Sequence, residues 1–116
     1  MTNWTTLPHE NLLAYQVAKE LLRLVCAAGI SNSKLRDQAL RAAQSACLNI
    51  AEAAGRFSAA DKARVFAIAR GEACEAAAAL DIAAVSGECS TDAANAAGAA
   101  ARRAYALLTG LIRKRA

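Results

Sequence analysis

Two glutamates that flank a cysteine are the residues of this sequence most able to do chemistry. Residues 72–75 are Glu-Ala-Cys-Glu, and carboxylates three positions apart share one side of a helix. Helical bundles hold pairs of metal ions with Glu and Glu-x-x-His motifs, but no histidine follows at that spacing here. The single histidine, His9, lies near the start of the chain. We therefore expect no metal site, no cofactor and no enzymatic activity.

The cysteines show neither a metal-binding nor a catalytic pattern. They are Cys26, Cys47, Cys74 and Cys89, and no two of them form a C-x-x-C pair. A zinc site needs four closely spaced ligands, and a nucleophilic cysteine needs a neighbouring base. A secretion signal consists of a basic segment followed by an apolar one, and the first residues show no such pattern. We interpret the cysteines as small buried apolar residues of a protein in the reducing cytoplasm.

The composition predicts an all-α protein. Alanine supplies 33 of the 116 residues, whereas aromatic residues make up 4% and proline occurs once. Alanine favours helices, and strands favour the β-branched and aromatic residues that are scarce here. With 56% hydrophobic and 21% charged residues, the composition also argues against disorder. No uncharged apolar run approaches the ~18 residues that span a bilayer, so we expect no membrane association.

Apolar spacing and helix-ending residues divide the chain into four helices. The helices are predicted at about residues 9–28, 34–54, 59–85 and 91–116. The residues that end or cap them are Gly29, Gly55, Gly87, Ser58 and Ser90, together with the polar run 31–33. Phe57 follows the second helix and is expected to act as a hydrophobic latch. Because short loops force neighbouring helices to be antiparallel, we predict one domain, 1–116, folded as an up-down-up-down four-helix bundle.

Polar side chains line one face of the second predicted helix. They are Arg41, Ser45, Asn49, Glu52 and Arg56, which fall within an arc of about 80°. Spacing alone leaves two alternatives: a solvated face, or a polar cluster that is partly buried.

The third predicted helix favours a partly buried cluster. Arg70 and Cys74 mark its solvent side, and Glu72 and Glu75 lie well away from that side. A carboxylate buried alone is very costly, so we expect these glutamates to pair with Arg41 or Arg56, within the chain or across a subunit contact. Gly71 beside them would admit another helix.

The supply of large apolar residues indicates self-association. Leucine, isoleucine, valine and phenylalanine together number 24, and the inward face of the last two helices is mostly alanine and glycine. Small residues bury little surface each, and bundles that lack large core residues gain burial by assembling. We therefore expect a homo-oligomer.

The positive charge of the chain is concentrated in the last predicted helix. Residues 57–90 carry a net charge of −2, whereas residues 91–116 carry +4. The basic residues there are Arg102, Arg103, Arg113, Lys114 and Arg115. Cations at a helix C-terminus are expected from the helix dipole alone, but such a patch is also suited to phosphates. Tyr105 is predicted to face the core, so base stacking is not expected.

The second and third helices together resemble a known family. The matching residues are Arg41-Ala42-Ala43, Ser45, NIAEAAGR at 49–56 and ARGEACE at 69–75. They resemble small bacterial four-helix-bundle proteins encoded in intervening sequences of 23S ribosomal RNA genes, and the accessory protein of diversity-generating retroelements. The resemblance implies a bundle that assembles as a closed ring of five subunits without enzymatic activity. It also implies that Arg41, Asn49, Glu52, Arg56, Gly71 and Glu75 belong to the family pattern.

Two classes of function remain open at this point. Retroelement members of the family bind nucleic acid and a reverse transcriptase, so one hypothesis is a homo-oligomeric accessory module for RNA, DNA or a nucleic-acid-processing protein. The alternative is a structural or protein-interaction scaffold that binds no nucleic acid.

Overall fold

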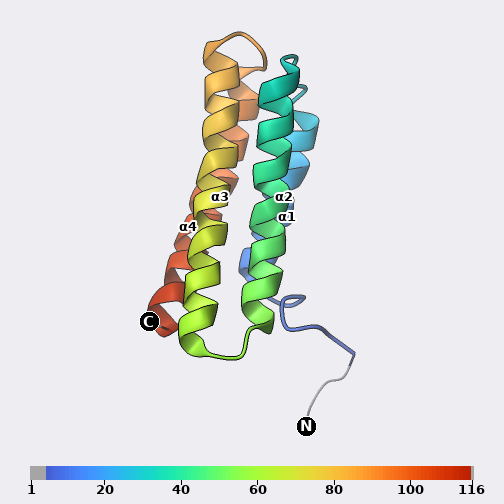
Figure 1. The fold of residues 1–116 in the computed structure, drawn as a ribbon. Helices are drawn as coiled ribbons and strands as arrows, with labels where there is room; N and C mark the ends of the chain where they lie inside the picture. The colour runs from blue at the N-terminus through green and yellow to red at the C-terminus, as the bar shows by residue number, and fades with distance from the viewer. Residues whose placement is uncertain (1–4, 116) are drawn as a thin grey trace.

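Four long helices connected by short turns make up the structure. The computed structural model describes residues 5–115, and side chains for residues 5–114. The helices are α1 (Leu13–Ala27), α2 (Ser33–Gly55), α3 (Ala59–Val85) and α4 (Thr91–Arg115). Successive helices are connected at alternate ends of the molecule (Figure 1), so each runs opposite to the one before it. The predicted all-α class and four-helix bundle are confirmed.

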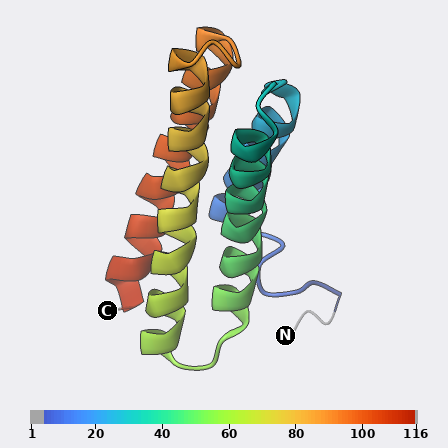
Figure 2. The ribbon, with the colours of Figure 1, turned by 45° about the horizontal axis from the view of Figure 1, so that its top comes forward.

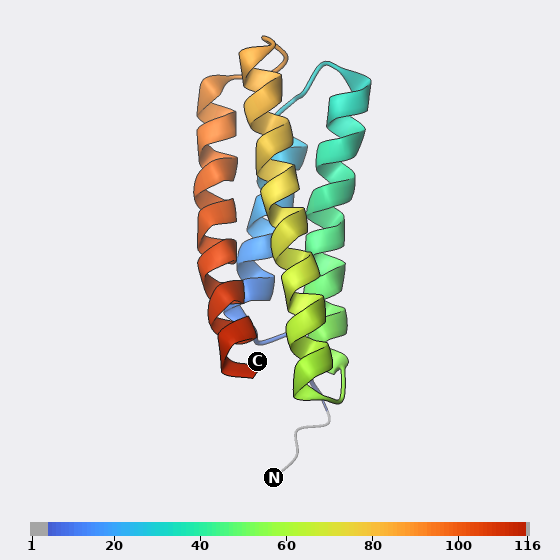
Figure 3. The same cartoon turned by 60° about the vertical axis from the view of Figure 1, so that its left-hand side comes forward.

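The helices surround the core in the order of the chain. α2 packs on α3, α3 on α4, α4 on α1, and α1 on α2. α3 and α4 run together along one side of the molecule (Figure 2), and α1 lies behind α3 when α3 faces the viewer (Figure 3). α1 has only 15 residues, whereas α2, α3 and α4 have 23, 27 and 25. One wall of the bundle is therefore shorter than the other three.

Local signals set most of the helix ends. Gly29 and Gly87 adopt φ angles of +64° and +76°, which glycine tolerates best, and they follow the ends of α1 and α3. The starts of α2, α3 and α4 are capped by side-chain oxygens that accept a backbone N–H three residues ahead, at 3.0–3.1 Å. The capping residues are Asn32, Ser58 and Ser90.

α1 begins later than predicted. It starts at Leu13 rather than near His9. Before it, the amides of Glu10 and Leu12 donate to the carbonyls of Leu7 and His9, three residues back, which closes two turns. The Glu10 carboxylate accepts the Leu7 amide at 2.9 Å and closes the first turn a second time. These local bonds compete with the helix, so the predicted start was wrong by about one turn.

Alanine dominates the core. The largest fully buried side chains are Phe66, Leu21, Ile50, Leu80, Leu108 and Val65, and most of the remaining core residues are alanines. Phe66, Ala69, Ala73, Ala76 and Leu80 form a buried row along α3, while Ala84 at the end of this row is partly exposed. Among the described residues the core contains no buried polar or charged side chain. Small side chains let the helix axes approach closely, but each buries little apolar surface.

Several large apolar side chains remain outside the core. Leu48 on α2 is 70% exposed and Val85 at the end of α3 is 86% exposed, and Ile68 and Ile82 of α3 are also exposed. Phe57 is fully exposed, so the predicted hydrophobic latch was wrong. Over the part of the chain that the structure describes, none of the helices has the length and apolar character needed to cross a bilayer.

Candidate functional site

A surface of uncompensated positive charge lies on the outer side of α4. Arg102, Arg103, Arg113 and Lys114 are exposed, and none of them forms a hydrogen bond or ion pair with a described residue. The side chain of Arg115, the fifth predicted member, lies outside the described residues. We call the four described residues the α4 basic surface.

The α4 basic surface consists of two parallel rows. Arg102 and Arg113 are separated by 11 positions, as are Arg103 and Lys114. Eleven residues of helix rise about 16 Å and return to within about 20° of the same direction. Each row therefore places two cations on one ridge, along the outside of the bundle.

Three arginines outside α4, namely Arg23, Arg56 and Arg64, pair with acidic side chains. Arg23 pairs with Glu20 at 2.5 Å, and Arg56 pairs with Glu52 at 2.7 Å. Glu20 raises the pKa of Arg23, chiefly through their hydrogen bond. α4 has one acidic residue, Asp92, in its first turn, which is more than two turns away from the basic surface. The net charge of the chain is therefore expressed mainly on α4.

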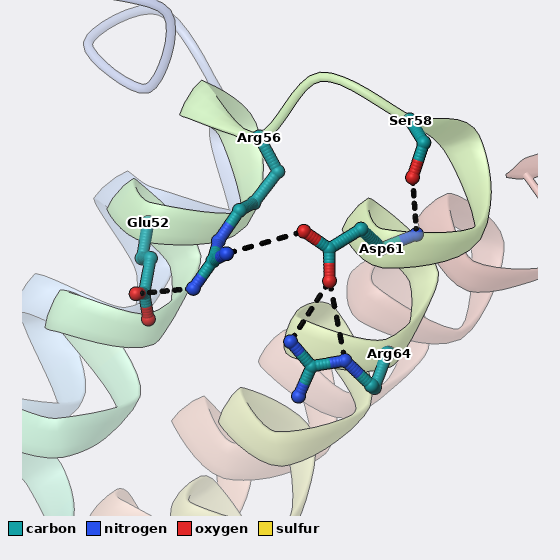
Figure 4. A network of polar contacts seen from close by, with 5 residues as sticks. All are labelled: Glu52, Arg56, Ser58, Asp61 and Arg64. Atoms are coloured by element: carbon teal, nitrogen blue, oxygen red, sulfur yellow. Dashed lines mark hydrogen bonds and ion pairs between the residues drawn. The ribbon is translucent and has the colours of Figure 1, made fainter.

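A polar network joins the end of α2 to the start of α3 (Figure 4). Arg56 lies between the Glu52 and Asp61 carboxylates, with N–O distances of 2.7 and 3.2 Å. Arg64 holds the other oxygen of Asp61 at 2.8 Å, and the Asp61 amide donates to Ser58 Oγ. The hydrogen bond from Arg64 and the charges of both arginines hold the pKa of Asp61 below its ordinary value. Two predicted cluster members, Glu52 and Arg56, therefore close the turn between the helices.

The other predicted residues of α2 lie farther along the same helix. Asn49 is half-buried and its amide donates to the Ser45 carbonyl and hydroxyl at 2.9 and 3.0 Å. Arg41 is exposed and has no hydrogen-bond or ion-pair partner among the described residues. Arg41, Asn49 and Glu52 line one shallow hollow together with the exposed Leu48.

The sequence predicts that Glu72 and Glu75 are buried, but within one chain they are not. Glu72 is half-buried, Glu75 is exposed, and neither pairs with Arg41 or Arg56. A side chain built on Gly71 would meet nothing within 4 Å, so this glycine does not mark a helix crossing inside the bundle. The prediction of an intrachain pair was wrong: the α2 residues that share a hollow with Glu75 are Leu35 and Gln38, which carry no positive charge. A pair across a subunit contact stays a prediction.

The exposed side of α3 has the pattern of a helix seam. Ile68, Gly71, Glu75, Ile82 and Val85 follow one another at intervals of three, four or seven residues. Such spacing keeps apolar residues on one ridge that a partner helix can cover. Glu75 and Ile82 border α2, because they line a shared hollow with residues of that helix. We call this ridge, together with Leu48 and Arg41 of α2, the α2–α3 outer face.

A further polar contact between α3 and α4 was missed by the sequence analysis. The Arg70 guanidinium lies over the Tyr105 ring, 4.8 Å from its centre, and donates to Thr109 Oγ1 at 3.0 Å. Tyr105 is 45% exposed, so its predicted core-facing position was wrong, and Arg70 packs on α4 rather than pointing into solvent. The antiparallel register carries the signal: position 70 lies opposite 109 and position 74 opposite 105, so Arg70 and Tyr105 are about one turn apart.

The four cysteines differ in burial. Cys47 is buried, and burial raises the pKa of its thiol. Cys89 is half-buried, and Cys26 and Cys74 are exposed, so the interpretation of the cysteines as buried was wrong for Cys26 and Cys74, whereas the placement of Cys74 on the solvent side of α3 is confirmed. In the described part of the chain, no three His, Cys, Asp or Glu side chains come together as metal ligands.

Comparison with known proteins rests on one finding. The family model of the 23S rRNA-intervening sequence protein matches residues 10–110. No curated protein matches the chain. The matched range contains Arg102 and Arg103 of the α4 basic surface but ends before Arg113 and Lys114. It contains the whole α2–α3 outer face. Since the model spans most of the chain, including α1, α2 and α3 in full, the protein belongs to the 23S rRNA-intervening sequence protein family.

Proposed function

We propose that this protein is a non-enzymatic, homo-oligomeric accessory module that binds nucleic acid through the α4 basic surface. The observation that carries the proposal is the set of four exposed cations on α4 without acidic partners among the described residues. Phosphate groups would supply the missing negative charge. Membership of a family named for 23S rRNA intervening sequences supports a function that involves contact with nucleic acid.

Such a surface contacts phosphates rather than base edges, so it tolerates many sequences. Each neutralised phosphate contributes about 0.9 to the slope of log affinity against log salt. Four cations contacting phosphates therefore predict a loss of about 100-fold in affinity between 50 and 200 mM salt, for contact with one subunit. In an assembly every subunit repeats the surface, which strengthens binding through multivalency.

The α2–α3 outer face supports self-assembly. It exposes Ile68, Ile82 and Val85 of α3 and Leu48 of α2, and its Arg41 and Glu75 have no ionic partner among the described residues. We assign this face to the contact between subunits. The proposed assembly is a closed ring of five, and this number comes from the family resemblance rather than from the geometry of one chain. A closed ring leaves no copy of the face uncovered.

Light scattering tests the assembly. The wild type should have a mass about five times the 12.0 kDa of one chain, and Ile82→Lys should lower it. Leu13→Lys is the matched control, because Leu13 is equally exposed but lies on α1, away from the α2–α3 outer face. A wild-type mass near that of one chain at micromolar concentration would contradict the assembly.

Fluorescence anisotropy with duplex DNA and structured RNA tests the binding. Arg102→Glu/Arg113→Glu should abolish binding at 50 mM salt, whereas Arg102→Lys/Arg113→Lys keeps the charge and should retain it. Lys34→Glu/Arg36→Glu makes the same change of charge at the start of α2 and should bind nearly as the wild type does. Equal binding by the Arg102→Glu/Arg113→Glu variant would remove the α4 basic surface from the mechanism.

The alternative function is a protein scaffold, and the α2–α3 outer face is the observation that favours it. An exposed apolar face can be covered by another protein as well as by a second copy. No binding of nucleic acid by the wild type at 50 mM salt, together with a stable assembly, would favour the scaffold over the proposed function.

A further inference from the structure

A groove runs between α3 and α4 beside the α4 basic surface. It has a volume of about 250 Å³, and Cys74, Ala77, Gly98, Ala101, Arg102 and Tyr105 line it. A second hollow of about 260 Å³ shares Ala77, Gly98 and Arg102 with it and extends to Asp81 and Asn95. Half of the residues that line the groove are alanine or glycine, so little side-chain volume fills the space between the helices.

An aromatic ring closes one end of this groove. Arg70 lies over the Tyr105 ring from the side of Thr109, one turn toward the end of α4. The groove lies toward the start of α4, because its other α4 residues, Gly98, Ala101 and Arg102, all precede Tyr105. Tyr105 therefore separates a fixed guanidinium from an open groove. The hydrogen bond to Thr109 holds the guanidinium, which in turn braces the ring.

Arg102 brings positive charge to the floor of the groove. Its guanidinium lies so close to Gly98 that a Cβ at that position would come within 3.2 Å of Nη1. The charged end of Arg102 thus lies back along α4, over the glycine, instead of extending away from the helix. Arg102 therefore belongs to the α4 basic surface and also lines the groove.

An exposed aromatic ring, an adjacent cation with no ionic partner among the described residues, and a groove between them match the chemistry of one nucleotide. We propose that the α3–α4 groove binds single-stranded nucleic acid, with a base stacked on Tyr105 and the neighbouring phosphate held by Arg102. In a duplex the faces of the bases are covered by their neighbours, so only an unpaired nucleotide fits this site. This inference rests on the proposed function and adds to it that the bound nucleic acid is single-stranded at this point.

The test compares two probes that carry the same phosphates. One is a fluorescein-labelled 12-nucleotide deoxythymidine strand, and the other is an abasic strand of the same length. Stacking of one base on an aromatic side chain is worth ~5- to 100-fold in affinity, so the wild type should prefer the deoxythymidine strand by a factor in that range. Tyr105→Leu should remove the preference, and Tyr105→Phe should retain it. Tyr15→Leu is the matched control, because Tyr15 also contacts a cation, Lys19, but lies on α1.

Cys74 gives a second measurement that requires no substitution. It lines the groove and is exposed, as is Cys26, which lies at the end of α1 outside the groove. Saturating deoxythymidine strand should slow the alkylation of Cys74 by N-ethylmaleimide at least fivefold and leave Cys26 unchanged. An unchanged rate at Cys74 in the saturated complex would overturn the inference.

The outcomes separate this inference from the proposed function. Equal affinity for the two strands overturns stacking on Tyr105 and leaves phosphate binding by α4 in place. No binding of either strand at 50 mM salt overturns both. If Tyr105→Leu changes the mass of the assembly but leaves both affinities unchanged, the groove is a contact between copies of the chain and the inference is wrong.

Discussion

The two phenylalanines of this chain form a matched pair for testing the fold. Phe66 on α3 is 1% exposed, whereas Phe57 in the turn before α3 is fully exposed. Both substitutions, Phe66→Ala and Phe57→Ala, remove the same atoms. Any difference between their effects therefore measures the environment of the ring and not its chemistry.

The structure sets the size of this difference. Removing a buried phenylalanine ring costs 3–5 kcal/mol, depending on how far the neighbours can fill the space. Five of the nine other buried residues in the cluster around Phe66 are alanines, which have no side-chain rotamers with which to fill a cavity. We therefore expect Phe66→Ala to lower the free energy of unfolding by about 4–5 kcal/mol, near the top of that range. Phe57→Ala should change it by less than about 0.5 kcal/mol.

Urea denaturation followed by circular dichroism measures both values. The experiment is done at two protein concentrations, because assembly adds a concentration-dependent term to the stability. A difference between the two variants of less than about 1 kcal/mol at both concentrations would refute the placement of the two rings.

Three further predictions concern charge, pH and thiols. Arg41→Ala and Glu75→Ala should each lower the free energy of unfolding by less than about 1 kcal/mol, because both side chains are exposed and without ionic partners among the described residues. Urea denaturation at a concentration where the chain is monomeric measures both values. A loss above about 2 kcal/mol would reveal a buried partner. Hydrogen bonds from Arg64 lower the pKa of Asp61, so the contribution of Asp61 to stability is complete above its unfolded pKa of about 4 and is lost as the pH falls through its lower folded pKa. Between pH 5 and pH 3 the urea midpoint should therefore fall more for the wild type than for Asp61→Asn. Parallel curves for the two proteins would contradict the network. In the absence of nucleic acid, N-ethylmaleimide should modify Cys26 and Cys74 first and Cys47 last, since Cys47 is buried and burial raises the pKa of its thiol. Mass spectrometry measures the order of modification. Early modification of Cys47 would show that the core opens readily.

The fold could be predicted because its determinants are local. Ser58 caps α3 through an amide three residues ahead, and Gly29 follows α1 in a conformation that suits glycine. Neither requires knowledge of the rest of the chain. The start of α1 could not be predicted, because the turns formed by Leu7 and His9 compete with a helix of similar local stability.

The candidate site was harder to predict, because α3 gives little information on its own orientation. Apolar residues occur on nearly all sides of this helix, so periodicity cannot separate the side that faces the core from the side that faces out. Glu72 and Glu75 were assigned to the interior for this reason. Tyr105 lies next to the buried Ala104 of α4, and only the packing of α3 on α4 decides that its ring is exposed.

The alanine core also decides which changes the sequence can accept over time. An alanine has no side-chain rotamers to lose on folding, so this core forms with little loss of side-chain entropy per residue. At the same positions a larger residue would have to push two helices apart, and overpacking costs ~1–3 kcal/mol even where some adjustment is available. Drift at these sites is therefore confined to residues as small as alanine, while positions filled by Leu21 or Leu80 can exchange among large aliphatic residues. Conserved small residues in the middle of the helices would mark the close packing of this fold, and not a binding site.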